Sequence, residues 1–187
     1  MSEPVFTIAN QLTLLRMALA PVLVVCVLSR QPGWALAAFV LAGLTDAFDG
    51  FFARRGGQQT TLGAMLDPVA DKILLGSTYV VLTWSAVPCA IPVWVTVTLL
   101  SRDAITIVSV AVINLTVGRR VFAPSLLGKV TTAAQILTAG LVLLANALGH
   151  CPAYLAWTFR TLVLLIVVSA VHYTFFATVR PAEPGPS

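Results

Sequence analysis

The stretch from Asp46 to Lys72, DAFDGFFARRGGQQTTLGAMLDPVADK, holds four of the seven acidic residues of the chain, and apolar sequence lies on both sides of it. The four are Asp46, Asp49, Asp67 and Asp71. Hydrocarbon penalises charge, so a membrane protein keeps such groups where they face a cavity, a partner or an ion. Because four carboxylates in so short a span repel one another unless cations hold them together, the stretch predicts a divalent-metal site at a membrane surface.

The composition of the chain predicts a membrane protein. Hydrophobic residues make up 58% of the 187 residues and charged residues only 10%, whereas a soluble domain is about a quarter charged. The length suits one domain of about six spanning helices at roughly 20 residues each. The net charge of +4 comes without a basic run interleaved with aromatic residues, which argues against a nucleic-acid partner. We expect an all-α membrane protein with six transmembrane helices, one domain over residues 1–180 and a disordered tail over residues 181–187.

Apolar runs separated by short polar loops place the helices. We expect them over about residues 8–29, 34–54, 62–87, 91–117, 125–148 and 153–178. With six spans, both termini share one face with the loops after the second and fourth helices, and basic residues gather there: Arg54, Arg55, Arg119, Arg120, Lys129 and Arg180. The positive-inside rule puts this face, both termini and the four aspartates in the cytoplasm, in what we expect to be a bacterial inner membrane.

The first helix lacks the features of a cleavable signal peptide. The N-terminus has no basic region and its apolar run continues too long, so we expect a retained signal-anchor. Arg16 lies about two turns into this helix and has two interpretations. It can extend to the membrane interface, or it can face the same polar cavity as the carboxylates.

The three cysteines of the chain carry no motif. Cys26, Cys89 and Cys151 are isolated, flanked by apolar residues and odd in number. We therefore expect small buried hydrophobes, and neither a disulfide framework nor a metal site.

Helical spacing arranges the four aspartates in two pairs. At 3.6 residues per turn, Asp46 and Asp49 lie about 60° apart, and Asp67 and Asp71 about 40° apart. The loop between their helices is short, so the helices are antiparallel neighbours and the two pairs meet. Ligation by carboxylates alone selects hard cations such as Mg²⁺ or Mn²⁺. Interfacial salt bridges could account for one or two of the aspartates, but the few cations nearby leave negative charge in excess.

Small residues and an arginine accompany the aspartates. Gly50 and Gly63 let a ligand or the facing helix approach the backbone. Arg54 is one turn beyond Gly50 and offers a planar fork suited to phosphate. Together with a metal pair, these residues predict a nucleotide diphosphate site.

The pattern D-x2-D-G-x2-A-R-x8-G-x3-D-x3-D resembles the signature of the CDP-alcohol phosphatidyltransferase family. The chain matches all its fixed positions: Asp46, Asp49, Gly50, Ala53, Arg54, Gly63, Asp67 and Asp71. The length and the expected six helices resemble the same family, so the resemblance covers nearly the whole chain.

The resemblance implies a fold, two metal ions and a reaction. It implies a bundle of membrane helices in which the four aspartates bind two ions of Mg²⁺ or Mn²⁺ that hold the pyrophosphate of CDP-diacylglycerol. Gly50, Ala53 and Gly63 would then line the cytidine pocket, and Arg54 would pair with the diphosphate. Asp71 resembles the general base that takes the proton of the acceptor hydroxyl, after which CMP leaves. The resemblance also implies a homodimer.

The acceptor alcohol is the open question. The opening N-x-L-T-x-x-R, matched at Asn10, Leu12, Thr13 and Arg16, resembles phosphatidylglycerophosphate synthases and the related cardiolipin synthases, and so does the run with Gly128, Lys129, Thr132 and Gln135. Neither motif separates the two groups. Glycerol 3-phosphate is a dianion that needs two or more cationic partners, and the candidates are Arg102, Arg119, Arg120 and Lys129.

Arg102 bears on that choice. A local pair with Asp103 is possible, but adjacent residues on a helix do not face each other, so we expect a ligand or the metal site as its partner. Phosphatidylglycerophosphate synthases usually carry Arg-Glu at this position and a further arginine soon after, which this chain lacks. The difference favours phosphatidylglycerol as the acceptor, as in a cardiolipin synthase. We prefer glycerol 3-phosphate and keep phosphatidylglycerol as the alternative.

A transporter is a third interpretation, because intramembrane aspartates also relay protons or ions. Such a pathway needs polar groups deeper in the bundle, and the fifth helix shows little beyond Gln135. We therefore rank it below the enzyme.

Overall fold

The structure is a computed structural model of the whole chain. It describes the backbone over residues 8–56, 61–116 and 126–179, and the side chains over residues 11–46, 69–108 and 126–171. Within these ranges the chain forms helices and short connections without strands, as expected for an all-α protein. The helices of the described backbone are α1 (Ile8–Leu28), α2 (Pro32–Gly56), α3 (Thr61–Trp84), α4 (Val93–Thr116), α5 (Leu126–Ala147) and α6 (Tyr154–Val179).

The helices have the length and the surface of membrane segments. They run from 21 to 26 residues, and about 20 apolar residues cross the hydrocarbon core. Over the described residues, three segments are both long and apolar enough to span: Gln11–Leu28, Leu126–Ala147 and Tyr154–Val171. Large apolar side chains such as Val25, Leu137 and Leu164 point outward and are more than half exposed. These helices fit a membrane protein.

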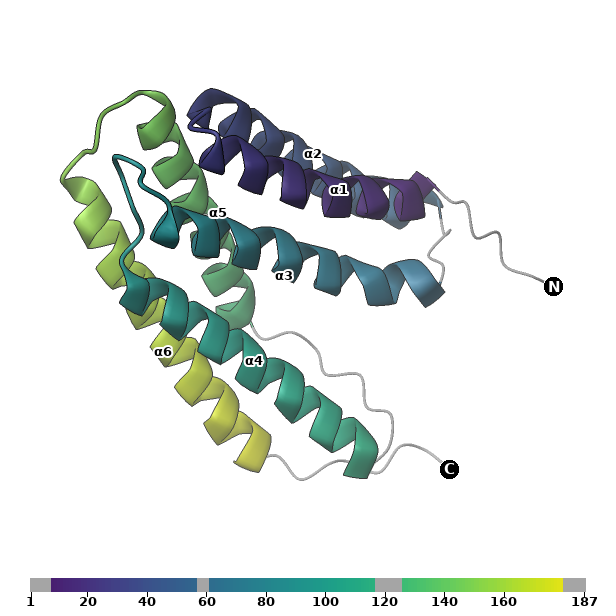
Figure 1. Cartoon of the computed structure of the whole chain (residues 1–187). Helices are drawn as coiled ribbons and strands as arrows, with labels where there is room; N and C mark the ends of the chain where they lie inside the picture. The colour runs from purple at the N-terminus through teal and green to yellow at the C-terminus, as the bar shows by residue number, and fades with distance from the viewer. Residues whose placement is uncertain (1–7, 57–60, 117–125, 180–187) are drawn as a thin grey trace.

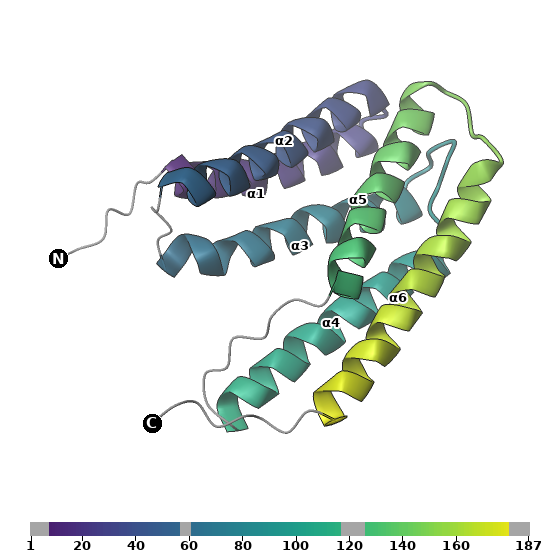
Figure 2. The ribbon, with the colours of Figure 1, turned by 180° about the vertical axis from the view of Figure 1, so that it is seen from behind.

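The helices form two groups that diverge from one end of the molecule. Helices α1, α2 and α3 pack together, α4 packs on α6, and α5 contacts α2, α3 and α6 (Figures 1 and 2). The α3–α4 and α5–α6 connections lie at the end from which the groups diverge (Figure 1). We call this the loop end. The C-terminal end of α2 and the N-terminal end of α3 lie at the far end of the first group (Figure 1).

Small residues let α2 approach its neighbours closely. Ala35, Ala38 and Ala42 recur at helical spacing on α2 and are at most 5% exposed. Without a hydrophobic driving force between helices in lipid, such small side chains favour close van der Waals packing. Phe39, between them, packs its buried ring beside Gly140 of α5. This packing fixes α2 against the rest of the bundle.

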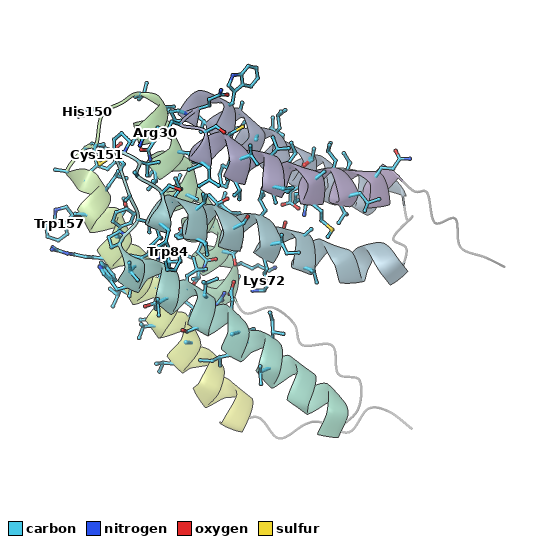
Figure 3. The ribbon with its side chains drawn as sticks, viewed as in Figure 1. Arg30, Lys72, Trp84, His150, Cys151 and Trp157 are labelled. Atoms are coloured by element: carbon cyan, nitrogen blue, oxygen red, sulfur yellow. A yellow bond between two sulfur atoms is a disulfide. The ribbon has the colours of Figure 1, made fainter. Side chains whose placement is uncertain are left out.

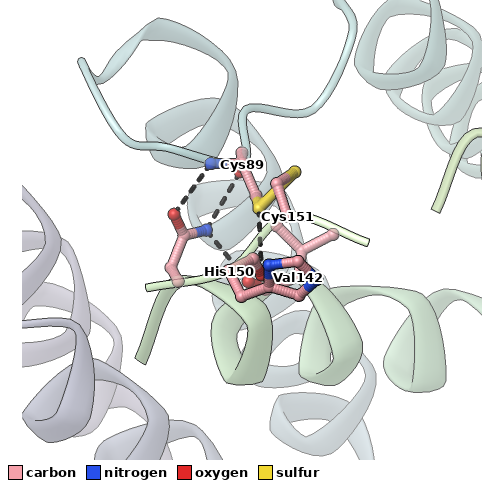
Figure 4. The surroundings of a disulfide bond; sticks show 5 residues. Cys89, Val142, His150 and Cys151 are labelled. Carbon is pink, nitrogen blue, oxygen red and sulfur yellow. Dashed lines mark hydrogen bonds between the residues drawn. A yellow bond between two sulfur atoms is a disulfide. The ribbon is translucent and has the colours of Figure 1, made fainter. Parts of the chain in front are cut away.

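A disulfide closes the loop end, which corrects the expectation for two of the cysteines. Cys89 and Cys151 are joined although 62 residues separate them (Figure 4). No local motif indicates this pairing, because the residues approach only when α3 and α5 both end at the loop end. Cys26 is a free, partly buried thiol, as expected.

Asn146 of α5 holds the same connection by its side chain. Its Oδ1 accepts the Cys89 backbone N–H at 3.0 Å, and its Nδ2 donates to the Cys89 carbonyl at 2.9 Å (Figure 4). The Nδ2 also donates to the Val142 carbonyl at 2.9 Å. The backbone N–H and the backbone carbonyl of buried Cys89 are thereby both satisfied, which irregular backbone needs wherever water is excluded.

Candidate metal and nucleotide site

One face of α1 supplies the centre of the site. Thr13, Arg16, Ala20, Leu23 and Val27 follow one another at spacings of three and four residues, and each is at most 4% exposed. Such spacing marks a single helical stripe, and α1 packs against both α2 and α3. Arg16 therefore lies in the contact between three helices. Of its two interpretations, the structure supports the one in which it faces the carboxylates.

Arg16 joins two of the predicted metal ligands. Its Nη2 lies 2.8 Å from Oδ1 of Asp46 on α2, and its Nη1 lies 2.6 Å from Oδ1 of Asp71 on α3. The contact with Asp71 is a hydrogen bond and the contact with Asp46 is an ion pair, and one guanidinium can make both because its nitrogens lie in a rigid plane. The two ends of the acidic stretch, 25 residues apart in sequence, thus meet on one cation.

Exposure differs sharply across this cluster. The Arg16 side chain is 1% exposed, whereas those of Asp46 and Asp71 are 51% and 43% exposed. The cation therefore lies on the protein side of the carboxylates, which keep an accessible side. The two carboxylates come from two helices that both pack on α1, and hard carboxylate oxygens are the donors that Mg²⁺ and Mn²⁺ prefer. The described part of the site fits such an ion.

The remaining predicted ligands lie outside the described side chains: Asp49, Gly50, Ala53, Arg54, Gly63 and Asp67. Their backbone belongs to α2 and α3, the helices on which the sequence placed them. Among the side chains that are described, no three metal-binding groups gather in one place. The four-aspartate site therefore stays a prediction, of which the structure places Asp46 and Asp71 together.

A second ion cluster joins α3 to α4. Lys72 Nζ and Arg102 Nη1 each lie 2.9 Å from Oδ1 of Asp103. Figure 3 shows Lys72 between the two helices. The expectation that Arg102 would not pair with Asp103 is therefore wrong. Lys72 reaches Asp103 from the neighbouring helix, and the long arginine side chain folds back to the same oxygen, so helical adjacency did not prevent the contact.

The other predicted acceptor residues are placed only in part. Lys129 is exposed in the first turn of α5, and Arg119 and Arg120 lie outside the described residues. Sequence reasoning missed the role of Lys72, which was counted only as a nearby cation. The signal that could have found it is the position of Asp103 in an apolar helix, since such a charge needs a partner.

Polar side chains also tie α3 to its neighbours beyond the site. The Tyr79 hydroxyl donates to the Gln135 carbonyl of α5 at 3.0 Å. The hydroxyls of Thr83 and Thr96 lie 2.6 Å apart between α3 and α4. These bonds pair polar groups that hydrocarbon would otherwise leave unsatisfied. They hold the helix that carries Asp71 in a fixed register.

The fold and the paired aspartates agree with the family that the signature suggested. The family model described as CDP-alcohol phosphatidyltransferase matches residues 6–175, so the chain belongs to the CDP-alcohol phosphatidyltransferase family. As a member of this family, it is an integral membrane phosphotransferase of phospholipid biosynthesis.

Individual relatives carry two different names. The chain is 34% identical over 170 residues to the cardiolipin synthase (CMP-forming) of Streptomyces coelicolor, a match that covers 84% of this chain and 76% of that protein. It is 35% identical over 175 residues to a Mycobacterium tuberculosis protein named probable phosphatidylglycerophosphate synthase, covering 89% of this chain and 79% of the relative. Human cardiolipin synthase (CMP-forming) is 45% identical over 109 residues, which are 58% of this chain and 35% of the human protein. The names divide between the two groups that the motifs did not separate.

Proposed function

We propose that the chain transfers the phosphatidyl group of CDP-diacylglycerol to a glycerol-based alcohol and releases CMP. The observation that carries this proposal is the meeting of Asp46 and Asp71 on Arg16, which joins the first and last positions of the family signature in space. In the reaction the acceptor oxygen bonds to the lipid-side phosphorus, the bond from that phosphorus to the CMP oxygen breaks, and the acceptor hydroxyl loses its proton.

Four aspartates form the metal site in this proposal. Asp46 and Asp49 of α2 and Asp67 and Asp71 of α3 hold two ions of Mg²⁺ or Mn²⁺. Bound there, the ions would neutralise charge on the diphosphate of the donor. The support is the signature, together with the half-exposed carboxylates of Asp46 and Asp71.

Nearby residues bind the rest of the donor. Arg54 pairs with the diphosphate, and Gly50, Ala53 and Gly63 leave space for the cytidine. Asp71 takes the proton of the acceptor hydroxyl. Its exposure supports this role, because a base must be reachable by its substrate.

The described charges favour phosphatidylglycerol as the acceptor, which would make the chain a cardiolipin synthase. Glycerol 3-phosphate is a dianion and needs several available cations, whereas phosphatidylglycerol carries one negative charge. Arg102 forms an ion pair with Asp103, and Lys72 of the neighbouring helix forms an ion pair with the same carboxylate. Glycerol 3-phosphate is the second candidate. The opening motif and the named relative in Mycobacterium tuberculosis support it.

The orientation we propose puts the aspartates and both termini in the cytoplasm, with six spans in a bacterial inner membrane. The disulfide at the loop end supports it, because disulfides persist in oxidising compartments outside the cytoplasm. Trp34, Trp84 and Trp157 are exposed at the loop-end termini of α2, α3 and α6, as in an interfacial aromatic belt (Figure 3). Residues 1–180 form the membrane domain in this proposal, and residues 181–187 a tail.

A homodimer is part of the proposal, supported by the resemblance to the family. Light scattering of the purified protein in detergent measures the protein mass directly. Two chains of 19.8 kDa are expected, and a single chain would exclude the dimer under those conditions.

The experiment that tests the activity measures CMP release. Purified protein receives CDP-diacylglycerol and Mg²⁺ or Mn²⁺, with phosphatidylglycerol and glycerol 3-phosphate supplied in separate reactions. Faster release with phosphatidylglycerol, and cardiolipin as the lipid product, are expected. Faster release with glycerol 3-phosphate would select the second candidate, and no release with either would reject the proposed reaction.

A further inference from the structure

Arg16 is a buried cation that forms ion pairs with two of the predicted metal ligands. Its guanidinium contacts one oxygen of Asp46 and one oxygen of Asp71, on two different helices. A charge on a membrane helix is costly, and its retention points to a functional partner. The position of Arg16 in the stripe of α1 fixes it between α2 and α3.

The difference in exposure between Arg16 and the two carboxylates shows on which side of them the cation lies. A cation that took the place of a metal ion would lie on the open side of the carboxylates, where a ligand enters. Arg16 is 1% exposed, while the two carboxylates are about half exposed. It therefore binds them from behind, and their accessible side stays available.

We propose that Arg16 is a positioning residue of the metal site, which orients Asp46 and Asp71 so that both carboxylates present their accessible side to the same divalent ions. This inference rests on the metal site of the proposed function. Groups that hydrogen-bond metal ligands orient those ligands, and their loss commonly weakens metal binding by about 10–100-fold. Arg16 also offsets the repulsion between the two carboxylates when they come together.

The test measures Mn²⁺ binding by the purified full-length protein in detergent, from the electron paramagnetic resonance signal of free Mn²⁺. Arg16→Met removes the charge and keeps an unbranched apolar side chain. Arg16→Lys keeps the charge, but one ammonium lacks the planar fork that joins two carboxylates. Arg160→Gln is the matched control, because it removes one positive charge from an exposed position in the second turn of α6.

The expected result is a Mn²⁺ dissociation constant raised about 10–100-fold in Arg16→Met and at least about threefold in Arg16→Lys, with Arg160→Gln equal to the wild type. Thermal unfolding in EDTA reports separately on the fold without metal. An unchanged dissociation constant in folded Arg16→Met, with only a lower unfolding temperature, would show a structural ion pair and overturn the proposal. A lower Mn²⁺ dissociation constant in Arg16→Met would show that Arg16 competes with the metal, and it would overturn the proposal as well.

If Arg16→Met does not fold, Arg16→Lys provides the test. An Arg16→Lys variant that binds Mn²⁺ as tightly as the wild type would then overturn the inference. Failure of this inference is distinct from failure of the proposed function. Wild-type protein that binds Mn²⁺ and releases CMP, with no effect of Arg16, rejects only the positioning role. Wild-type protein that binds no Mn²⁺ rejects the metal site and the positioning role together.

Discussion

Replacing Asn146 by leucine should destabilise the loop end measurably. Leucine has nearly the same shape as asparagine, so the substitution removes hydrogen bonds with little change in volume. The Cys89 N–H and carbonyl lose their partners at a residue that is 2% exposed. Each buried group left unsatisfied costs about 1–3 kcal/mol, and partial relaxation toward water lowers the sum, so we expect a loss of about 2–4 kcal/mol.

The loss should be visible as a lower unfolding temperature. For a chain of this size, 1 kcal/mol corresponds to roughly 2–4 °C, which gives a shift of about 4–16 °C. Tryptophan fluorescence can follow unfolding in detergent, because Trp84 lies at the end of α3 next to the affected connection. Thr98→Val is the matched control. It removes a single bond, from the Thr98 hydroxyl to the Trp94 carbonyl of the same helix, and should change the stability by no more than about 0.5 kcal/mol.

An Asn146→Leu variant that unfolds within about 1 °C of the wild type would refute this reasoning. It would mean that water or another group satisfies the Cys89 peptide unit at no cost. A shift of similar size in Thr98→Val would also count against it, because the effect would then not be specific to the loop end.

Three further predictions concern charges and thiols. In intact cells, a membrane-impermeant maleimide should modify the exposed Cys151 only after reduction, and labelling of Cys151 without reductant would contradict the disulfide. Asp71→Asn should lower CMP release by about 10²–10⁴-fold with the fold retained, and a rate equal to the wild type would exclude it as the base. Asp103→Asn leaves two cations without their carboxylate, so it should lower the stability by about 1–3 kcal/mol in thermal unfolding, and an unchanged unfolding temperature would show that the cluster contributes nothing.

The helices were predictable because hydrocarbon sets their length. Each observed helix begins and ends within three residues of the expected range. The meeting of Asp46 and Asp71 at one place was expected from direct contact between α2 and α3, whereas in the structure both helices pack on α1 and the two aspartates meet on Arg16. Arg16, which joins them, had two interpretations from the sequence, and neither was preferred. The stripe of α1 contained that information, since Arg16 shares its spacing with Leu23 and Val27.

The two wrong expectations have different physical causes. Cys89 and Cys151 lie in two connections that meet at one end of the molecule, and 62 residues separate them. Local spacing rules describe one helix at a time, so they cannot show such a contact. Arg102 and Asp103 are neighbours on α4, and there the spacing rule failed because a long arginine side chain can fold back to the next residue.

Helix α3 connects the two groups of helices through consecutive residues. Asp71 binds Arg16 of α1, and the next residue, Lys72, binds Asp103 of α4. Adjacent residues on a helix point about 100° apart, so these two bonds oppose rotation of α3 from two directions. A rotation that moved the carboxylate of Asp71 would have to break one bond or the other. The ion cluster on α4 therefore stabilises the orientation of the proposed base, although none of its members needs to touch the substrate.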